Sequence, residues 1–170
     1  MSALIATFAA RKTARRTTAV QRPPRILAVA SGGGHWVQLM RLRPAFSGAE
    51  VHYATVDRSA AATVAPAPVH LYPDANRDTP LRLMLTALRL ALIVLHVRPD
   101  VVVSTGAAGG YLAIRFARVL GARTMFIDSI ANARALSVSA RLSQRVADRV
   151  LCQWPAVAHA TGATYCGAVL

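Results

Sequence analysis

The sequence Ser31-Gly32-Gly33-Gly34-His35 has the residue types of an anion-binding turn. It follows a short apolar run, Ile26 to Ala30, that is typical of a strand buried on both faces of a parallel sheet, and His35 opens a segment with helical spacing. A glycine-rich turn between a strand and a helix presents free backbone amides at the positive end of the helix dipole, and therefore suits a phosphate or another oxyanion. A purely structural tight turn is the alternative.

Other phosphate-binding motifs do not fit this turn. A dinucleotide fingerprint counted from Gly32 would need a third glycine where Val37 stands. The chain contains no Gly-Lys-Ser or Gly-Lys-Thr sequence and no G-x-S-x-G nucleophile elbow. The turn therefore predicts contact with an anion or a sugar phosphate without specifying a nucleotide.

A second stretch repeats the arrangement. The buried strand expected over Val101 to Thr105 leads into Gly106-Ala-Ala-Gly109-Gly110, which we interpret as a glycine-rich turn before a helix over Tyr111 to Leu120. Turns that follow parallel strands lie at the same edge of the sheet. We therefore expect both turns to contact one anionic ligand, through Ser31, Gly32, Gly33, Gly34, Thr105, Gly106, Gly109 and Gly110.

The rest of the chain alternates between strand-like and helix-like segments. We expect strands over 26–30, 50–56, 69–72, 101–105, 122–127 and 149–152, and helices over 35–42, 81–97, 111–120 and 135–146. Such alternation predicts an α/β fold with a Rossmann-like parallel sheet flanked by helices and right-handed crossovers.

The helix expected over Leu81 to Val97 is apolar almost all round. Its basic side chains, Arg82, Arg89 and His96, are seven residues apart and so lie along one narrow stripe. Two interpretations stay open: a crossover helix buried in the domain, or a helix that lies in a membrane interface with its cations towards the headgroups.

Composition limits the partners. The 170 residues include 20 basic and 7 acidic side chains, for a net charge of +13, which predicts attraction to polyanions. We favour an anionic membrane surface and expect no nucleic acid, because nucleic-acid motifs are absent and aromatic residues make up only 6% of the chain. Residues 1–24 are predicted to be a disordered basic leader, either a solvated tail or an electrostatic lipid tether, before one domain over 25–170. Cys152 and Cys166 are too few for a metal site, and they favour a reducing compartment.

Five ordered motifs together point to a family: Ser31 to His35, Ser104 to Ala108, Phe126 to Ser129, Ala147-Asp148 and Gln153 to Pro155, followed by the terminal Gly167 to Leu170. With them the chain resembles the acceptor-side subunit of two-chain UDP-sugar glycosyltransferases. One branch is the oligosaccharide biosynthesis subunit of the dolichol-linked N-acetylglucosaminyltransferase. The other comprises bacterial capsule and exopolysaccharide homologues, the glycosyltransferase enhancer proteins, and the wording of the motifs is closer to this branch.

The resemblance implies a split GT-B enzyme of which this chain is the N-terminal, acceptor-binding half. A second chain would supply most of the UDP-sugar site, since a complete transferase needs roughly twice the length. The expected function is transfer of N-acetylglucosamine or another hexose from a UDP-sugar to a polyprenyl-diphosphate-linked acceptor, at the cytoplasmic face of the membrane, by an inverting reaction that requires the partner chain. A non-catalytic membrane scaffold that activates a separate glycosyltransferase is the alternative, and a free-standing nucleotide-binding module is a third hypothesis. We expect no cofactor and no metal.

The same resemblance suggests roles for four residues. His35 is a candidate general base, because its side chain titrates near neutral pH; otherwise it is a helix-start residue bonded to a loop carbonyl. Asp128 is expected to orient His35 or to act as the base itself, the alternative being a helix cap. Trp154 and Leu170 are assigned either to a partner interface or to the core.

Overall fold

The computed structural model describes residues 7–8, 22–75 and 78–169. In these residues one parallel sheet has the strand order β3-β2-β1-β4-β5-β6-β7. The strands are β1 Arg25–Val29, β2 Glu50–Thr55, β3 Val69–Leu71, β4 Val101–Ser104, β5 Arg123–Ile127, β6 Arg149–Cys152 and β7 Thr164–Tyr165. The predicted Rossmann-like parallel sheet is confirmed.

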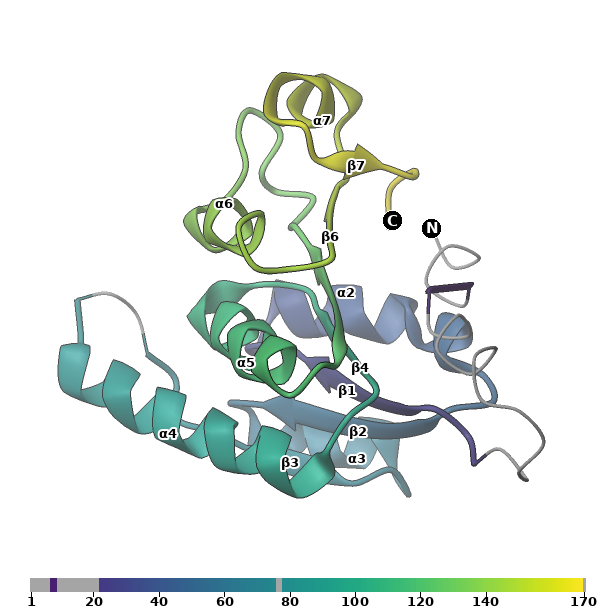
Figure 1. Ribbon diagram of the computed structural model, residues 1–170, viewed down its shortest axis with the longest axis vertical. Helices are drawn as coiled ribbons and strands as arrows, with labels where there is room; N and C mark the ends of the chain where they lie inside the picture. The colour runs from purple at the N-terminus through teal and green to yellow at the C-terminus, as the bar shows by residue number, and fades with distance from the viewer. Residues whose placement is uncertain (1–6, 9–21, 76–77, 170) are drawn as a thin grey trace.

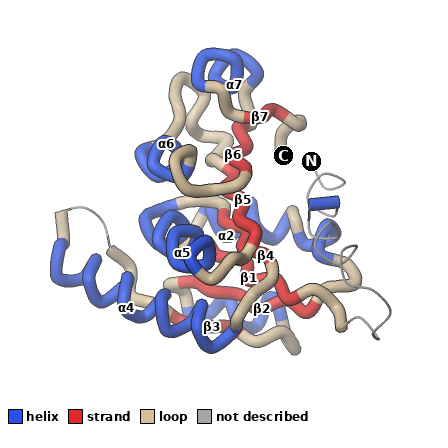
Figure 2. Tube along the Cα trace, in the orientation of Figure 1, coloured by secondary structure: helices blue, strands red, loops and turns tan. Residues whose placement is uncertain are grey.

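Helices cover both faces of this sheet. They are α2 Gly34–Arg41, α3 Ala61–Val64, α4 Pro80–Val97, α5 Ala107–Val119, α6 Val138–Ser143 and α7 Pro155–Thr161, with the 3-10 turns η2 Arg43–Phe46 and η3 Arg58–Ala60. Figure 1 shows α4 and α5 on one side of the sheet and α2 on the other. Figure 2 shows the strands running between these layers.

The alternation of side chains along the strands builds a core on each face. On the α2 side, Ile26 and Ala28 of β1 pack with Trp36 and Leu39 of α2. On the opposite side, Leu27 and Val29 pack with α4 and α5. Because a sheet with two covered faces needs apolar residues at every position, its central strands read as unbroken apolar runs in the sequence.

The point where the crossovers change sides lies between β1 and β4. These strands are parallel neighbours, with Val29 opposite Ser104, and the helices that follow them pack on opposite faces. In open α/β sheets such a switch point leaves a crevice beyond the carboxyl ends of the strands, where ligands bind. The prediction that the two glycine-containing turns share one edge of the sheet is confirmed.

The start of α5 was predicted wrongly. The helix begins at Ala107, not at Tyr111, so Gly109 and Gly110 are buried helical residues and Gly106 is the glycine of the turn. Both helical glycines have close neighbours: Gly109 lies against the ring of Tyr72, and Gly110 lies against the hydroxyl of Ser104. The glycine cluster therefore has two functions in the fold, turning the chain and packing a helix, and the sequence pattern shows only the first.

The C-terminal part also differs from expectation. The helix predicted over 135–146 covers only Val138–Ser143, because Ser137 caps it by accepting a hydrogen bond from the amide of Ala140. Helix α7 was not predicted; it begins at Pro155, the residue type that suits a first helical position, and ends before Gly162 in the left-handed region.

Helix α4 has features of both interpretations that the sequence left open. Its inner face, which includes Leu90, Ile93 and Val94, packs in the core as a crossover helix does. Its outer face is exposed and carries the large apolar residues Leu81, Met84, Leu85, Leu88, Leu92 and Leu95. Among the described residues α4 is the one helix long and apolar enough to cross a membrane, with a mean hydropathy of 1.7 and 28% of its residues buried.

Leu170 and most of the predicted basic leader lie outside the described residues. The described end of the leader makes one ion pair, in which the guanidinium of Arg22 lies 2.9 Å from the carboxylate of Asp100. Asp100 also accepts a hydrogen bond from the amide of Arg25 at the start of β1.

Candidate functional site

The turn after β1 leads into a helix start without a side-chain cap. Gly33 is the N-cap of α2, with φ of 61°, a left-handed conformation that glycine adopts without strain. The helix has no side-chain cap and no acidic residue in its first turn. The amides of Gly34, His35 and Trp36, the first three of the helix, are therefore available to an external anion.

The turn after β4 repeats this design on the opposite face. Gly106, with φ of 147°, is the N-cap of α5, which also lacks a side-chain cap and an acidic first turn. The hydroxyl of Ser104 accepts a hydrogen bond from the Gly106 amide at 3.2 Å. The positive ends of two helix dipoles thus meet at one edge of the sheet, an arrangement that favours an extended anion such as a diphosphate.

Two reciprocal hydrogen bonds join the turns. The Nδ1 atom of His35 lies 2.8 Å from the carbonyl oxygen of Thr105, and the Thr105 hydroxyl donates to the carbonyl oxygen of His35 at 2.7 Å. Because a carbonyl only accepts, Nδ1 carries the proton of the neutral ring, and Nε2 is left with a free lone pair. His35 therefore bonds a loop carbonyl, as one interpretation expected, and the same bond prepares its other nitrogen to accept a proton.

The ring of His35 also lies against Gly106. A Cβ atom at position 106 would come within 2.3 Å of Cε1 and Nδ1 of the imidazole. Only glycine leaves room for the ring, so the turn after β4 determines where the ring of His35 lies.

Gly109 and Gly110 belong to the first turns of α5 and not to the loop. A Cβ at position 109 would lie 2.6 Å from the ring of Tyr72, and one at position 110 would lie 1.9 Å from the hydroxyl oxygen of Ser104. Their lack of a side chain serves packing against β3 and β4. The amide of Gly109 is still one of the three at the start of α5 that lack a helical acceptor.

The carboxylate of Asp128 is buried and bonded to its own loop. Its side chain is 1% exposed and accepts hydrogen bonds from the amides of Ser129 and Ser137 and from the side-chain amide of Asn132, at 2.9 to 3.0 Å. The carboxylate thus organises the loop between β5 and α6. This geometry argues against Asp128 as the base and, in the described residues, gives it no hydrogen bond to His35.

Trp154 lies at the start of α7, with 38% of its surface exposed. Its indole nitrogen donates to the carbonyl oxygen of Ile130 at 2.7 Å, which fixes the ring against the loop after β5. An anchored, half-open indole suits a partner contact, and this role stays a prediction.

Sequence reasoning missed two features of this edge. Tyr72 follows β3 and is 5% exposed, and its hydroxyl has no hydrogen-bond partner among the described residues. Gln38 and Gln153, both buried, donate to the carbonyl oxygen of Asp128 at 3.3 and 2.8 Å. No motif marks Tyr72 or Gln38, and the motif Gln153 to Pro155 gives no role for Gln153, because each of these residues acquires its role only when distant segments meet. Among the described residues no group of three His, Cys, Asp or Glu side chains is placed to hold a metal ion.

Comparison with known families gives one match over more than half of the chain. Residues 75–169 match the family described as "Oligosaccharide biosynthesis protein Alg14 like". The chain is also 29% identical, over 169 aligned residues, to the UDP-N-acetylglucosamine transferase subunit ALG14 of Eremothecium gossypii. That alignment covers 80% of this chain and 75% of the relative.

Solved structures share the fold at low sequence identity. MurG of Acinetobacter baumannii superimposes with a TM-score of 0.70 at 16% identity, over 85% of this chain and 45% of MurG. The UDP-N-acetylglucosamine 2-epimerase of Rickettsia bellii superimposes with a TM-score of 0.63 at 10% identity, over 86% of this chain and 45% of the epimerase. The chain therefore spans less than half of the length of each of these structures, and the likeness is one of fold.

Proposed function

Since the chain belongs to the Alg14-like family of oligosaccharide biosynthesis proteins, we propose that it is the acceptor-binding subunit of a two-chain UDP-N-acetylglucosamine transferase. Its substrate would be a sugar acceptor linked to a polyprenyl diphosphate. The meeting of the N-termini of α2 and α5 at one edge of the sheet is the single observation that carries this assignment, because two uncapped helix ends suit a diphosphate.

In this proposal the diphosphate of the acceptor binds the amides of the two turns. Those of Gly34 and His35 approach it from α2, and those of Ala107 to Gly109 from α5. Ser31, Gly32 and Gly33 let the ligand come close to the main chain, and Thr105 and Gly106 hold the second turn in place.

His35 is the proposed general base. Its Nε2 lone pair would take the proton from the acceptor hydroxyl as that oxygen attacks the anomeric carbon of the UDP-sugar, and UDP would leave from the opposite face. The configuration at the anomeric carbon would invert. The hydrogen bond from Nδ1 to Thr105 favours this role, since it stabilises the ring as it becomes positively charged.

A second chain would supply the UDP-sugar. The relative in Eremothecium gossypii supports this, because it is named as a subunit. Trp154 and the C-terminal residue Leu170 are the proposed contacts for the partner chain.

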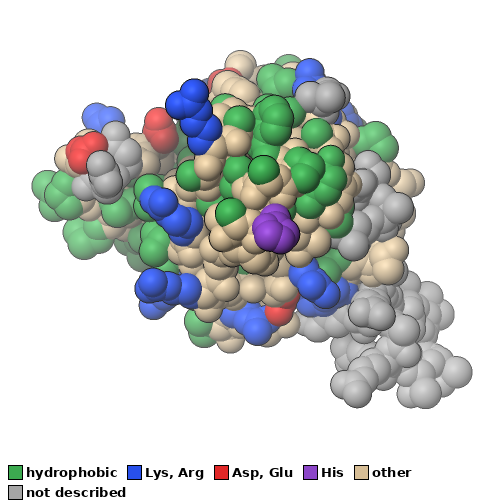
Figure 3. All heavy atoms as spheres, turned by 90° about the horizontal axis from the view of Figure 1, so that it is seen from above, with side chains coloured by type: hydrophobic (Ala, Val, Ile, Leu, Met, Phe, Trp, Pro, Cys, Tyr) green, Lys and Arg blue, Asp and Glu red, His purple; other side chains and the backbone are tan. Residues whose placement is uncertain are grey.

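The membrane surface is the proposed location, on its cytoplasmic face. The exposed apolar face of α4 supports it, together with exposed Arg82 and Arg89 on the same helix, which suit anionic headgroups. Figure 3 shows hydrophobic side chains on the part of α4 that projects beyond the sheet, and on this face basic side chains are more prominent than acidic ones.

Reconstitution tests the proposal. The chain is co-expressed with a candidate donor-binding glycosyltransferase chain, and transfer of labelled N-acetylglucosamine to a polyprenyl-diphosphate-linked sugar is measured. Activity that needs both chains and is lost in His35→Gln supports a catalytic subunit. Full activity in this variant, combined with loss of partner recruitment when the outer face of α4 is made acidic, supports the non-catalytic scaffold. Tight UDP binding by this chain alone would favour a nucleotide-binding module.

A further inference from the structure

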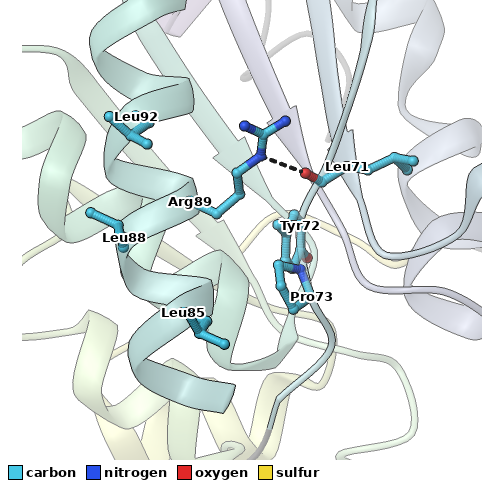
Figure 4. Close-up of a pocket in the computed structure, with 7 residues that line it drawn as sticks. All are labelled: Leu71, Tyr72, Pro73, Leu85, Leu88, Arg89 and Leu92. Atoms are coloured by element: carbon cyan, nitrogen blue, oxygen red, sulfur yellow. Dashed lines mark hydrogen bonds between the residues drawn. The ribbon is translucent and has the colours of Figure 1, made fainter. Parts of the chain in front are cut away.

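An open apolar groove runs between the end of β3 and helix α4. It has a volume of about 520 Å³, within the range of about 300–1,000 Å³ that small-molecule clefts occupy. It is lined by Leu71, Tyr72, Pro73, Leu85, Leu88, Arg89 and Leu92. Figure 4 shows the side chain of Arg89 reaching from α4 to the 71–73 segment, with Leu85, Leu88 and Leu92 along the same stretch of the helix.

The lining is aliphatic apart from one cation and one phenol. Leu85, Leu88 and Leu92 stand one turn apart along α4, each more than half exposed. Nε of Arg89 donates to the carbonyl oxygen of Leu71 at 3.1 Å, which fixes the guanidinium at the wall of the groove. Such a surface offers an aliphatic chain a continuous row of contacts, and a sugar few hydrogen bonds.

Tyr72 connects the groove to the start of α5. Its ring lines the groove, and its hydroxyl lies beside the first turn of α5, where a Cβ on Gly109 would be 2.8 Å away from it. The hydroxyl is buried and has no hydrogen-bond partner in the described part of the chain. A buried phenol without an acceptor is unusual, and an anion at the start of α5 would provide one.

We propose that this groove binds the isoprenoid units of the acceptor closest to its diphosphate. The diphosphate at the α5 end then accepts the hydrogen bond of the Tyr72 hydroxyl, and the branched hydrocarbon lies on Leu85, Leu88 and Leu92. This inference rests on the proposed function, because it assumes a polyprenyl diphosphate, and it adds that the protein itself, and not only the bilayer, binds the start of the lipid.

The test uses the full chain in buffer without lipid or detergent and four probes: inorganic diphosphate, isopentenyl diphosphate, farnesyl diphosphate and farnesol. Affinities are measured by calorimetry for the native chain, Leu88→Asp and Leu95→Asp. Leu95 is exposed on α4 but does not line the groove, so it is the matched control. Because both side chains are exposed, both variants are expected to fold, which circular dichroism checks.

We expect affinity to rise at least about tenfold from isopentenyl to farnesyl diphosphate, since each buried methylene contributes. Leu88→Asp is expected to remove this increment and to leave inorganic diphosphate binding unchanged, whereas Leu95→Asp keeps the increment. Equal affinity for both prenyl probes, or equal effects of the two variants, overturns the proposal and leaves the groove as part of a bilayer-facing surface.

Two further outcomes separate this inference from the proposed function. Farnesol binding that depends on Leu88, without any binding of inorganic diphosphate, supports the groove and contradicts the proposed diphosphate site at the starts of α2 and α5. Binding of inorganic diphosphate without any effect of prenyl chain length supports the proposed diphosphate site and contradicts binding of the isoprenoid in the groove.

Discussion

The imidazole of His35 lies against Gly106, so closely that a Cβ on the glycine would come within 2.3 Å of the ring. The two residues belong to different crossovers, one after β1 and one after β4, and they meet because these strands are parallel neighbours. The absence of a side chain at one turn thus fixes the position of the most reactive side chain at the other. This contact is the basis of the first two predictions.

Gly106→Ala is expected to displace the ring of His35. The new methyl group overlaps the imidazole, and the φ of 147° at this position suits glycine alone. We expect a loss of about 1–3 kcal/mol in the free energy of unfolding, together with a large fall in sugar transfer by the two-chain enzyme. Gly34→Ala is the stability control, because a Cβ there meets no atom within 4 Å. Equal stability of the two variants in urea titrations contradicts the close packing.

His35→Gln is expected to reduce sugar transfer by a factor of about 10²–10⁴, the usual contribution of a general base. Loss of the bond to Thr105 should lower stability by only about 1 kcal/mol. The measurement is kcat of the reconstituted enzyme across a pH series, beside a thermal melt. A base predicts that the variant loses the acidic limb of the pH profile; a purely structural histidine leaves its shape unchanged.

Gly110→Ala tests the packing of α5 on β4. A Cβ at position 110 would overlap the Ser104 hydroxyl at 1.9 Å and approach its Cβ to 3.0 Å, so we expect a loss of about 1–3 kcal/mol. In a Ser104→Ala background the hydroxyl is gone and the loss should be clearly smaller. Chemical denaturation of the four members of this double-mutant cycle measures the coupling. Additive losses would show that the two positions do not compete for space.

Much of the fold follows from local sequence. The central strands could be predicted because residues buried on both faces must be apolar, as in Val101 to Val103. The shared edge of the two turns follows from parallel strands, and the exposed leucines of α4 follow from an apolar helix too long to be covered by its neighbours.

The roles of several site residues could not be predicted, because they depend on contacts between distant segments. Gly109 looks like a loop glycine in the sequence and becomes a packing glycine only when Tyr72 meets it from β3. Asp128 follows a buried strand as a catalytic carboxylate would, yet the loop that folds back on it supplies three donors and buries it. Neither outcome has a local signal.

Three neighbouring histidines, His52 of β2, His70 of β3 and His96 of α4, predict that the stability of the fold depends on pH. Nδ1 of His52 lies 3.1 Å from Nε2 of His70, and the ring of His96 packs edge-on against His70. Burial, and then the charges of His52, His96 and Arg89, lower the pKa of His70 from its ordinary value of 6.5.

The unfolded chain therefore takes up this proton before the folded one, and stability should fall as the pH drops below about 6.5. His70→Leu should make the decrease between pH 7.5 and pH 5.5 shallower, as measured by urea denaturation at both pH values. A decrease as steep as that of the native chain would assign the pH dependence to other groups.

The outer face of α4 predicts binding to anionic vesicles. Leu81→Asp and Leu95→Asp each place a charge among exposed apolar residues, so both should weaken co-sedimentation with vesicles that contain an anionic phospholipid. Val119→Asp is the matched control, because Val119 is 82% exposed and belongs to α5, not to α4. Binding should also weaken with added salt, because salt screens the attraction between the arginines and the anionic headgroups. If all three variants sediment equally, electrostatic attraction of the whole chain, with its net charge of +13, and not the helix, would account for the binding.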